Sequence, residues 1–276
     1  MAGSQLGGGE FVLRVCSALV LAPLAIATAY VGGWLFAAFW AAAAIGIFCE
    51  WLWLVTQFRA RAALVTGIAT IALAAAIAAA GHVPAAIAVL AAGTVGPLAL
   101  APQSRRLWLA AGLLYAGSIA VAPILLRSDP ATGFLTIVLL FAVVWSTDII
   151  AYFLGRAIGG PKLMPRVSPR KTWSGALSGT GAAIVSTLAV AYAGSLTGTF
   201  PLGVLACALS VSAQAGDLLE SALKRKFGAK DASQLIPGHG GLMDRLDGFA
   251  AASFLAALIG VVRGGFETPG RGLLAW

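Results

Sequence analysis

Residues 132–153 form an apolar run that reads Thr-Gly-Phe-Leu-Thr-Ile-Val-Leu-Leu-Phe-Ala-Val-Val-Trp-Ser-Thr-Asp-Ile-Ile-Ala-Tyr-Phe. A helix of about 20 such residues crosses a bilayer, and the run lacks the alternation of a barrel strand. Its one charged side chain is Asp148, and a carboxylate inside the membrane is costly enough to indicate function. The run therefore predicts a transmembrane helix with a functional carboxylate. A structural ion pair with Arg156 is the alternative.

Runs of similar length follow one another along the chain. The sequence has 276 residues, of which 60% are hydrophobic and 10% charged, whereas a soluble domain has about 25% charged residues. Lipid offers no partner to backbone groups, so such runs must be helical. We predict an all-α, polytopic integral membrane protein with about nine transmembrane helices. The predicted spans are 11–31, 34–56, 63–81, 83–101, 107–126, 132–153, 173–195, 200–220 and 248–263.

The basic residues predict the orientation of these spans. With the N-terminus in the cytoplasm, 15 of the 18 Lys and Arg residues fall on the cytoplasmic side, and Arg127, Arg263 and Arg271 fall outside. Cytoplasmic loops carry such an excess, so we expect an N-in, C-out protein of the cytoplasmic (inner) membrane. The same rule accounts for the net charge of +8, and we expect no nucleic-acid partner. The polar loops 155–172 and 221–247 would both face the cytoplasm.

The polar residues divide the chain into two regions. Residues 1–130 are predicted to be a scaffold of transmembrane helices, and residues 131–276 a catalytic region. Glu50 is the only acidic residue of the first five spans. Because Trp51 and Trp53 follow it near a helix end, we expect Glu50 to lie at the membrane interface.

The first polar motif, residues 167–175, reads Val-Ser-Pro-Arg-Lys-Thr-Trp-Ser-Gly. Ser168 is predicted to cap the following helix, with Pro169 at the first helical position. Free N–H groups at that helix start, together with Lys171 and Thr172, would form a cradle for an anion. The alternative is a basic cytoplasmic loop with a good helix cap.

The second polar motif begins at the end of an apolar run. Asp217, Glu220, Ser221 and Lys224 are three or four residues apart, so they share one face of a helix. Glu220 and Lys224 could form only an ordinary i,i+4 pair. Asp217, however, lies where a lone carboxylate needs a partner.

Residues 221–247 read Ser-Ala-Leu-Lys-Arg-Lys-Phe-Gly-Ala-Lys-Asp-Ala-Ser-Gln-Leu-Ile-Pro-Gly-His-Gly-Gly-Leu-Met-Asp-Arg-Leu-Asp. The basic residues supply charge for phosphates, and the glycine-rich turn lets backbone approach a ligand. Asp247 is predicted to cap the last helix. Carboxylates beside basic residues suit Mg²⁺ with a polyphosphate. The motif predicts metal-assisted phosphoryl or nucleotidyl transfer to a lipid.

Residues 221–247 resemble the signature of the phosphatidate cytidylyltransferases, also known as CDP-diacylglycerol synthases. The elements Ser-x-Leu-Lys-Arg, Lys-Asp-x-Ser and Ile-Pro-x-His-Gly-Gly-Leu-x-Asp-Arg-Leu-Asp are all present in order. Residues 216–221 and 168–175 are also similar to segments of that family. The resemblance is specific in the second half of the chain and compositional in the first half.

This resemblance implies that CTP and phosphatidic acid react to CDP-diacylglycerol and pyrophosphate in phospholipid biosynthesis. It implies Mg²⁺ as the cofactor, leaves a second cation open, and implies a homodimer. The carboxylates implied in metal binding are Asp148, Asp217 and Asp244. The residues implied in catalysis are Asp217, Lys224, Asp244 and Asp247. The residues implied in substrate binding are Ser168, Lys171, Thr172, Ser221, Arg225, Lys230, His239 and Arg245.

Two other functions remain open from the sequence. A CTP-dependent polyprenol or dolichol kinase would share the nucleotide and the membrane but would release CDP rather than pyrophosphate. A transporter would line a pathway with intramembrane charges and broken helices. The gathering of the polar residues on one predicted side argues against a transporter.

Overall fold

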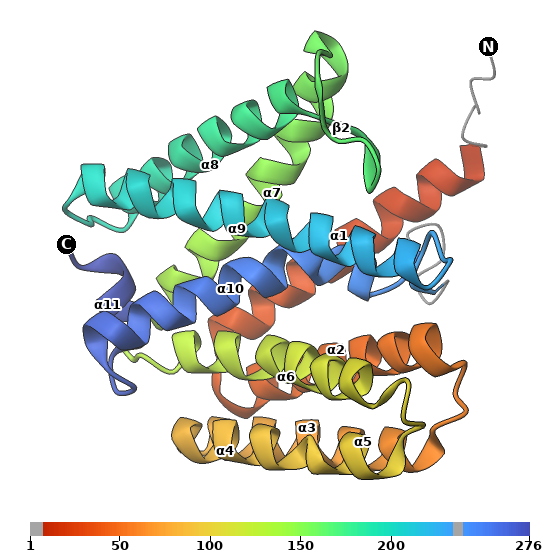
Figure 1. Cartoon of the computed structure of the whole chain (residues 1–276). Helices are drawn as coiled ribbons and strands as arrows, with labels where there is room; N and C mark the ends of the chain where they lie inside the picture. Colours follow the sequence, from red (N-terminus) through yellow and green to blue (C-terminus); the bar gives the residue numbers. More distant parts are fainter. Residues whose placement is uncertain (1–7, 234–239) are drawn as a thin grey trace.

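The computed structural model describes residues 8–233 and 240–276, and it consists of helices with one small hairpin (Figure 1). The elements are α1 (Gly8–Val31), α2 (Gly33–Thr56), α3 (Arg61–Ala79), α4 (Val83–Gly93), α5 (Val95–Leu100), α6 (Arg106–Arg127), α7 (Gly133–Ile158), β1 (Lys162–Met164), β2 (Ser168–Thr172), α8 (Trp173–Ala193), α9 (Thr199–Lys226), α10 (Met243–Gly264) and α11 (Pro269–Leu274).

The predicted membrane helices are largely confirmed. Within residues 8–233 and 240–276, eight helical segments are long and apolar enough to cross a membrane. The fourth of the predicted spans is divided at Thr94 into α4 and α5. The described apolar part of α1, Leu19–Val31, is shorter than a span. That α1 is a ninth transmembrane helix therefore stays a prediction.

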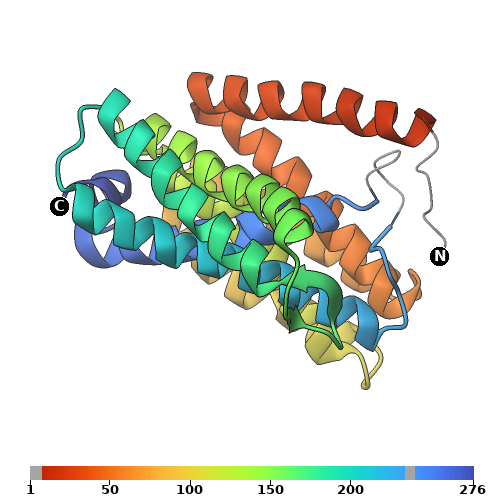
Figure 2. The same ribbon diagram turned by 90° about the horizontal axis from the view of Figure 1, so that it is seen from above.

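The helices form two groups joined by α10. In Figure 1, α2 to α6 lie together at the bottom of the view, and α7, α8 and α9 lie above them. α10 contacts helices of both groups, with its largest interface on α9. Figure 2 shows α1 along one edge of the molecule, where it contacts α2 and α7.

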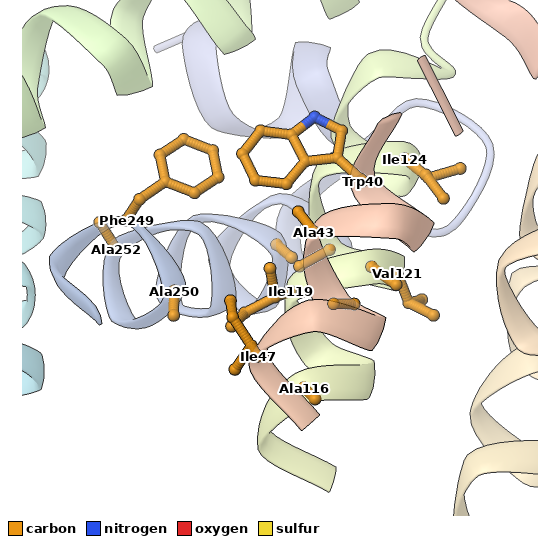
Figure 3. Close-up of a cluster of buried hydrophobic side chains, with 14 of the residues drawn as sticks. Trp40, Ala43, Ile47, Ala116, Ile119, Val121, Ile124, Phe249, Ala250 and Ala252 are labelled. Atoms are coloured by element: carbon orange, nitrogen blue, oxygen red, sulfur yellow. The ribbon is translucent and has the colours of Figure 1, made fainter. Parts of the chain in front are cut away.

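Aromatic side chains connect the two groups at α10. Figure 3 shows the Trp40 ring of α2 facing the Phe249 ring of α10. These rings are stacked, with centroids 4.6 Å apart and planes inclined by 10°. The Phe141 ring of α7 also contacts the Phe249 ring, with centroids 5.4 Å apart. Because Trp40 and Phe249 are buried, this packing fixes α10 between the two groups, and the start of α10 belongs to the candidate site.

Candidate active site

The hairpin between α7 and α8 carries the first polar motif. β1 and β2 pair antiparallel, with Lys162 opposite Thr172 and Met164 opposite Ser168. Ser168 is therefore extended rather than at a helix start, and the prediction that it caps α8 is wrong. The cap is Thr172, whose Oγ1 accepts a hydrogen bond of 3.2 Å from Gly175 N. Pairing with β1 moves the helix start to Trp173.

The two polar motifs meet through an ion pair. Lys171 on β2 binds the carboxylate of Asp217 on α9. Ser221 Oγ donates a hydrogen bond of 3.3 Å to the other oxygen of Asp217. The side chains of Lys171 and Asp217 are 28% and 32% exposed, so a ligand can reach both. The prediction that both polar motifs lie on the same side of the membrane is consistent with this contact.

Lys224 lies between two carboxylates. Its ammonium binds Asp244 Oδ1 and lies 3.3 Å from Glu220 Oε1. The three side chains are only 3 to 11% exposed, so solvent screens their interaction weakly. The pairs Asp217–Ser221 and Glu220–Lys224 confirm that these residues share one helix face.

Asp244 uses both of its oxygens within the protein. Lys224 occupies Oδ1, while Oδ2 accepts hydrogen bonds from Ala232 N at 3.0 Å and Gly241 N at 2.8 Å. Such amide contacts stabilise a carboxylate strongly. Asp244 therefore holds both sides of the loop between α9 and α10 together. Its predicted role as a metal ligand stays a prediction.

Glu50 is a site residue that the sequence interpretation missed. Its carboxylate is buried, with 4% of the residue exposed, and lies against the start of α10. It accepts hydrogen bonds from Ser233 Oγ at 2.5 Å, Leu242 N at 2.8 Å and Met243 N at 2.7 Å. A lone carboxylate within an apolar helix was the available signal, as it was for Asp148.

This contact also corrects the predicted cap of the last helix. α10 begins at Met243, so Asp247 lies inside the helix. The amides at the helix start are bound by Glu50 of α2 instead. Helix starts leave N–H groups without partners, and any suitably placed carboxylate can accept from them.

Gly241 fits between the two carboxylates of this loop. A Cβ atom at this position would lie 2.9 Å from Glu50 Oε2 and 3.0 Å from Asp244 Oδ2. Any larger side chain would push both carboxylates away. The second glycine of the Gly-Gly pair is therefore required by close approach within the protein.

A group of carboxylates surrounds the Lys171–Asp217 pair. Asp148 on α7 is exposed, and it lies within electrostatic range of Asp217, Asp247 and the cations Lys171 and Arg245. Asp247 lies close enough to Glu220 for the two carboxyl groups to interact. Arg156, the alternative partner of Asp148, contacts the Tyr152 hydroxyl at 3.4 Å. α7, α9 and α10 thus bring their acidic side chains to one place.

The donor atoms of this acidic group suit a divalent cation. Among the side chains described, no three acidic, His or Cys groups already have the geometry of a metal site. Glu220 Oε1 is a buried oxygen that faces the Lys224 ammonium at 3.3 Å without accepting a hydrogen bond. Carboxylate oxygens such as those of this group are the ligands that Mg²⁺ prefers. The residues present therefore fit Mg²⁺.

The remaining predicted residues lie on β2, α9, α10 and the loop after α9. Arg225 and Lys230 are exposed at the end of α9 and in the following loop, and Arg245 is exposed on the first turn of α10. Arg225 Nη1 donates to Ala229 O at 3.3 Å. Ser168 is partly exposed on β2. His239 lies outside the described residues, and its role stays a prediction.

Known proteins are similar to this chain over most of its length, not only in the two polar motifs. The sequence profile of the cytidylyltransferase family matches residues 12–262. The phosphatidate cytidylyltransferase of Brucella abortus (strain 2308) is 46% identical over 257 residues, which cover 90% of this chain and 93% of that protein. The protein of that name from Haemophilus influenzae is 43% identical over 132 residues, 45% of each chain. The one from Rickettsia bellii is 42% identical over 132 residues.

Proposed function

The chain belongs to the cytidylyltransferase family, and we propose from this that it is a phosphatidate cytidylyltransferase. It converts CTP and phosphatidic acid into CDP-diacylglycerol and pyrophosphate. Besides the family, the supporting observation is the ion pair between Lys171 and Asp217. This pair joins two motifs that are distant in sequence into one partly exposed polar site on a membrane protein.

In this reaction an oxygen of the lipid phosphate attacks the α-phosphorus of CTP. A new P–O bond forms, the bond to the β-phosphate oxygen breaks, and pyrophosphate leaves with that electron pair. The attacking oxygen is already anionic, so the protein need not remove a proton from it. Its tasks are to position two phosphate groups that repel each other and to neutralise their charge.

The cations of the site differ in their partners and in their exposure. Lys224 is held by Glu220 and Asp244, so it maintains the geometry of the loop and gives a fixed positive charge. Lys171 is paired with one partly exposed carboxylate, and an arriving phosphate can compete for its ammonium. The exposed Arg225, Lys230 and Arg245 bind the remaining phosphate oxygens.

We propose that Asp148, Asp217, Glu220 and Asp247 hold Mg²⁺, because they form the acidic group described above. The ion, when bound, neutralises charge on the triphosphate. Asp244 is left out of this set because its oxygens already bind Lys224 and two amides. Removal of Mg²⁺ with a chelator should stop turnover, and readdition should restore it.

We further propose an N-in, C-out orientation with the site at the cytoplasmic face of the inner membrane, and a homodimer. The orientation is supported by the distribution of Lys and Arg along the sequence.

The decisive experiment uses purified protein in detergent–lipid micelles with CTP, Mg²⁺ and phosphatidic acid. We expect CDP-diacylglycerol and pyrophosphate in equal amounts. Formation of CDP instead, with a polyprenol as acceptor, would identify a lipid kinase. Absence of any nucleotide turnover across several lipid compositions would contradict the proposal.

A further inference from the structure

A basic cavity lies at the same end of the helix bundle as the candidate site (Figure 1). Its volume is about 490 Å³, and it is formed by the ends of α2 and α9 and the segment between α5 and α6. Its cationic side chains are Arg59, Arg105 and Lys226. None of its lining residues belongs to the candidate site.

The cavity faces away from the candidate site around α9. Lys226 comes two residues after Lys224, which places the two side chains about 200° apart around the helix. Lys224 binds Glu220 and Asp244, whereas Lys226 points to the cavity side. The end of α9 thus contributes one lysine to the candidate site and another to the cavity.

Aromatic rings hold two of the cavity's cations. The Arg105 guanidinium lies 5.2 Å from the centroid of the Phe227 ring, and the Lys226 ammonium lies 4.4 Å from that of Trp108. The rings of Trp108 and Phe227 meet edge to face at 5.4 Å, and Trp51 Nε1 donates to Trp108 O at 2.8 Å. Cation–π contacts and this packing restrict the cations to the cavity wall.

The charges of this cavity are uncompensated. No acidic side chain lines it, and the ion pairs found in the described part of the chain do not include Arg59, Arg105 or Lys226. Cations excluded from ion pairs and held near one another repel, so an anion between them would be bound favourably. Arg guanidinium and Lys ammonium groups are the side chains that commonly bind phosphate.

We propose that this cavity binds a phosphate group in addition to those at the candidate site. The phosphate is carried by an anionic phospholipid headgroup or is free in solution. The helix ends that form the cavity adjoin the apolar spans, so a headgroup can enter while its chains remain in the bilayer. Bound phosphate would connect α2, α6 and α9.

The test measures binding of defined phosphates to the full-length protein by native mass spectrometry from detergent. The probes are phosphatidylglycerol, zwitterionic phosphatidylcholine and inorganic phosphate. We expect the double variant Arg59→Gln/Arg105→Gln to bind one of the two anionic probes about tenfold or more less tightly than the wild type does. Phosphatidylcholine should be unaffected. The matched control Arg156→Gln/Arg166→Gln removes the same charge from surfaces outside the cavity.

The outcomes distinguish the source of the phosphate. Weaker phosphatidylglycerol binding alone identifies a lipid headgroup, and weaker inorganic phosphate binding alone identifies a free anion. Either outcome supports a phosphate-binding site in the cavity. Unchanged binding of both anions, or an equal loss in the control, overturns it. If the double variant does not give a folded, monodisperse species, the exposed Lys226→Gln variant provides the same comparison.

Discussion

Asp217 and Asp244 are both aspartates of the second polar motif, yet their different surroundings give them different roles. Asp217 is about one-third exposed and binds one cation and one hydroxyl. Asp244 is nearly enclosed, with one ammonium and two amides on its oxygens. The first can exchange its partners for a ligand, whereas the second is committed to the loop.

Asp217→Asn should therefore reduce turnover by at least about 100-fold, with little change in thermal stability. Asp244→Asn should reduce both, because the buried Lys224 loses a carboxylate partner. Turnover and thermal unfolding in the same detergent would separate these effects. Glu267→Gln, an exposed acid outside both polar motifs, is the control. Normal turnover in Asp217→Asn would remove this residue from the metal-binding set.

Glu50 acts on the same loop from a helix in the other half of the chain. Replacing it with Gln leaves an amide group facing amides, so at least one buried N–H loses its acceptor at a cost of about 1–3 kcal/mol. We expect Glu50→Gln to increase hydrogen–deuterium exchange in peptides spanning 240–247 and to raise the KM for CTP. Peptides of α3 and α4 should not change.

The control for Glu50 is Thr70→Val, which removes a partly buried hydrogen bond of 2.8 Å within α3. It should leave the kinetics unchanged. Equal effects in both variants, or faster exchange throughout the Glu50→Gln protein, would show that Glu50 supports the bundle rather than the loop.

At the level of elements, the local sequence predicted the helices well and the hairpin poorly. A long apolar run forms a helix in lipid whatever helices pack against it, so its approximate bounds could be predicted from the sequence alone. Ser168 followed by Pro169 has the chemistry of a helix start, but the pairing of 168–172 with β1 overrides it. That pairing depends on a second segment, and local motifs do not encode it.

The corrected cap gives a simple test. Thr172→Val keeps the side-chain volume but removes the acceptor for Gly175 N, and should lower the free energy of unfolding by about 1 kcal/mol. Ser168→Ala should have no such effect, because Ser168 does not accept from the amides of α8. Thermal unfolding of the two variants distinguishes them, and equal losses would contradict the assignment of Thr172.

At the scale of the whole molecule, the sequence indicated that the two polar motifs lie on one side of the membrane, but it did not reveal the contacts that hold the second motif in place. The two polar loops were expected on the same side of the membrane, and the Lys171–Asp217 ion pair is consistent with that. Glu50 was missed because its partners are about 190 residues away, and no spacing rule reaches that far. The division into scaffold and catalytic regions stays a prediction, although the scaffold half supplies this contact.

The opposite end of the molecule has its own anchoring carboxylate, Asp129, between α6 and α7. Its oxygens accept hydrogen bonds from Ala131 N and Thr132 N at 3.0 Å and from Arg271 N of α11 at 2.8 Å. Burial alone would raise the pKa of Asp129, but these amide hydrogen bonds outweigh it and lower the pKa.

A lowered folded-state pKa stabilises the protein above the ordinary pKa of aspartate, about 4. This contribution disappears as the pH falls through the lower folded value. Wild type should therefore be more stable than Asp129→Asn at pH 7, and the difference should shrink below about pH 4. Thermal unfolding across this range measures it, with the exposed Glu267→Gln as control. A difference independent of pH would contradict this account.

Orientation can be tested at the two ends of the bundle. In a variant with Cys16, Cys49 and Cys207 replaced by Ala, single cysteines are placed at Ser195 and Gln103. A membrane-impermeant maleimide added to spheroplasts should label Ser195→Cys only. Both should react after permeabilisation. Labelling of Gln103→Cys in intact spheroplasts would reverse the orientation.

The contact of Glu50 with the start of α10 also has a consequence for biogenesis. The ribosome makes Leu242 and Met243 about 190 residues after Glu50, which takes about 10–40 s at 5–20 residues per second. Throughout this interval α2 has been synthesised, but its carboxylate lacks its final partners. A Glu50→Leu variant should therefore insert α2 more readily during synthesis, even though the finished protein loses the acceptor that fixes its loop.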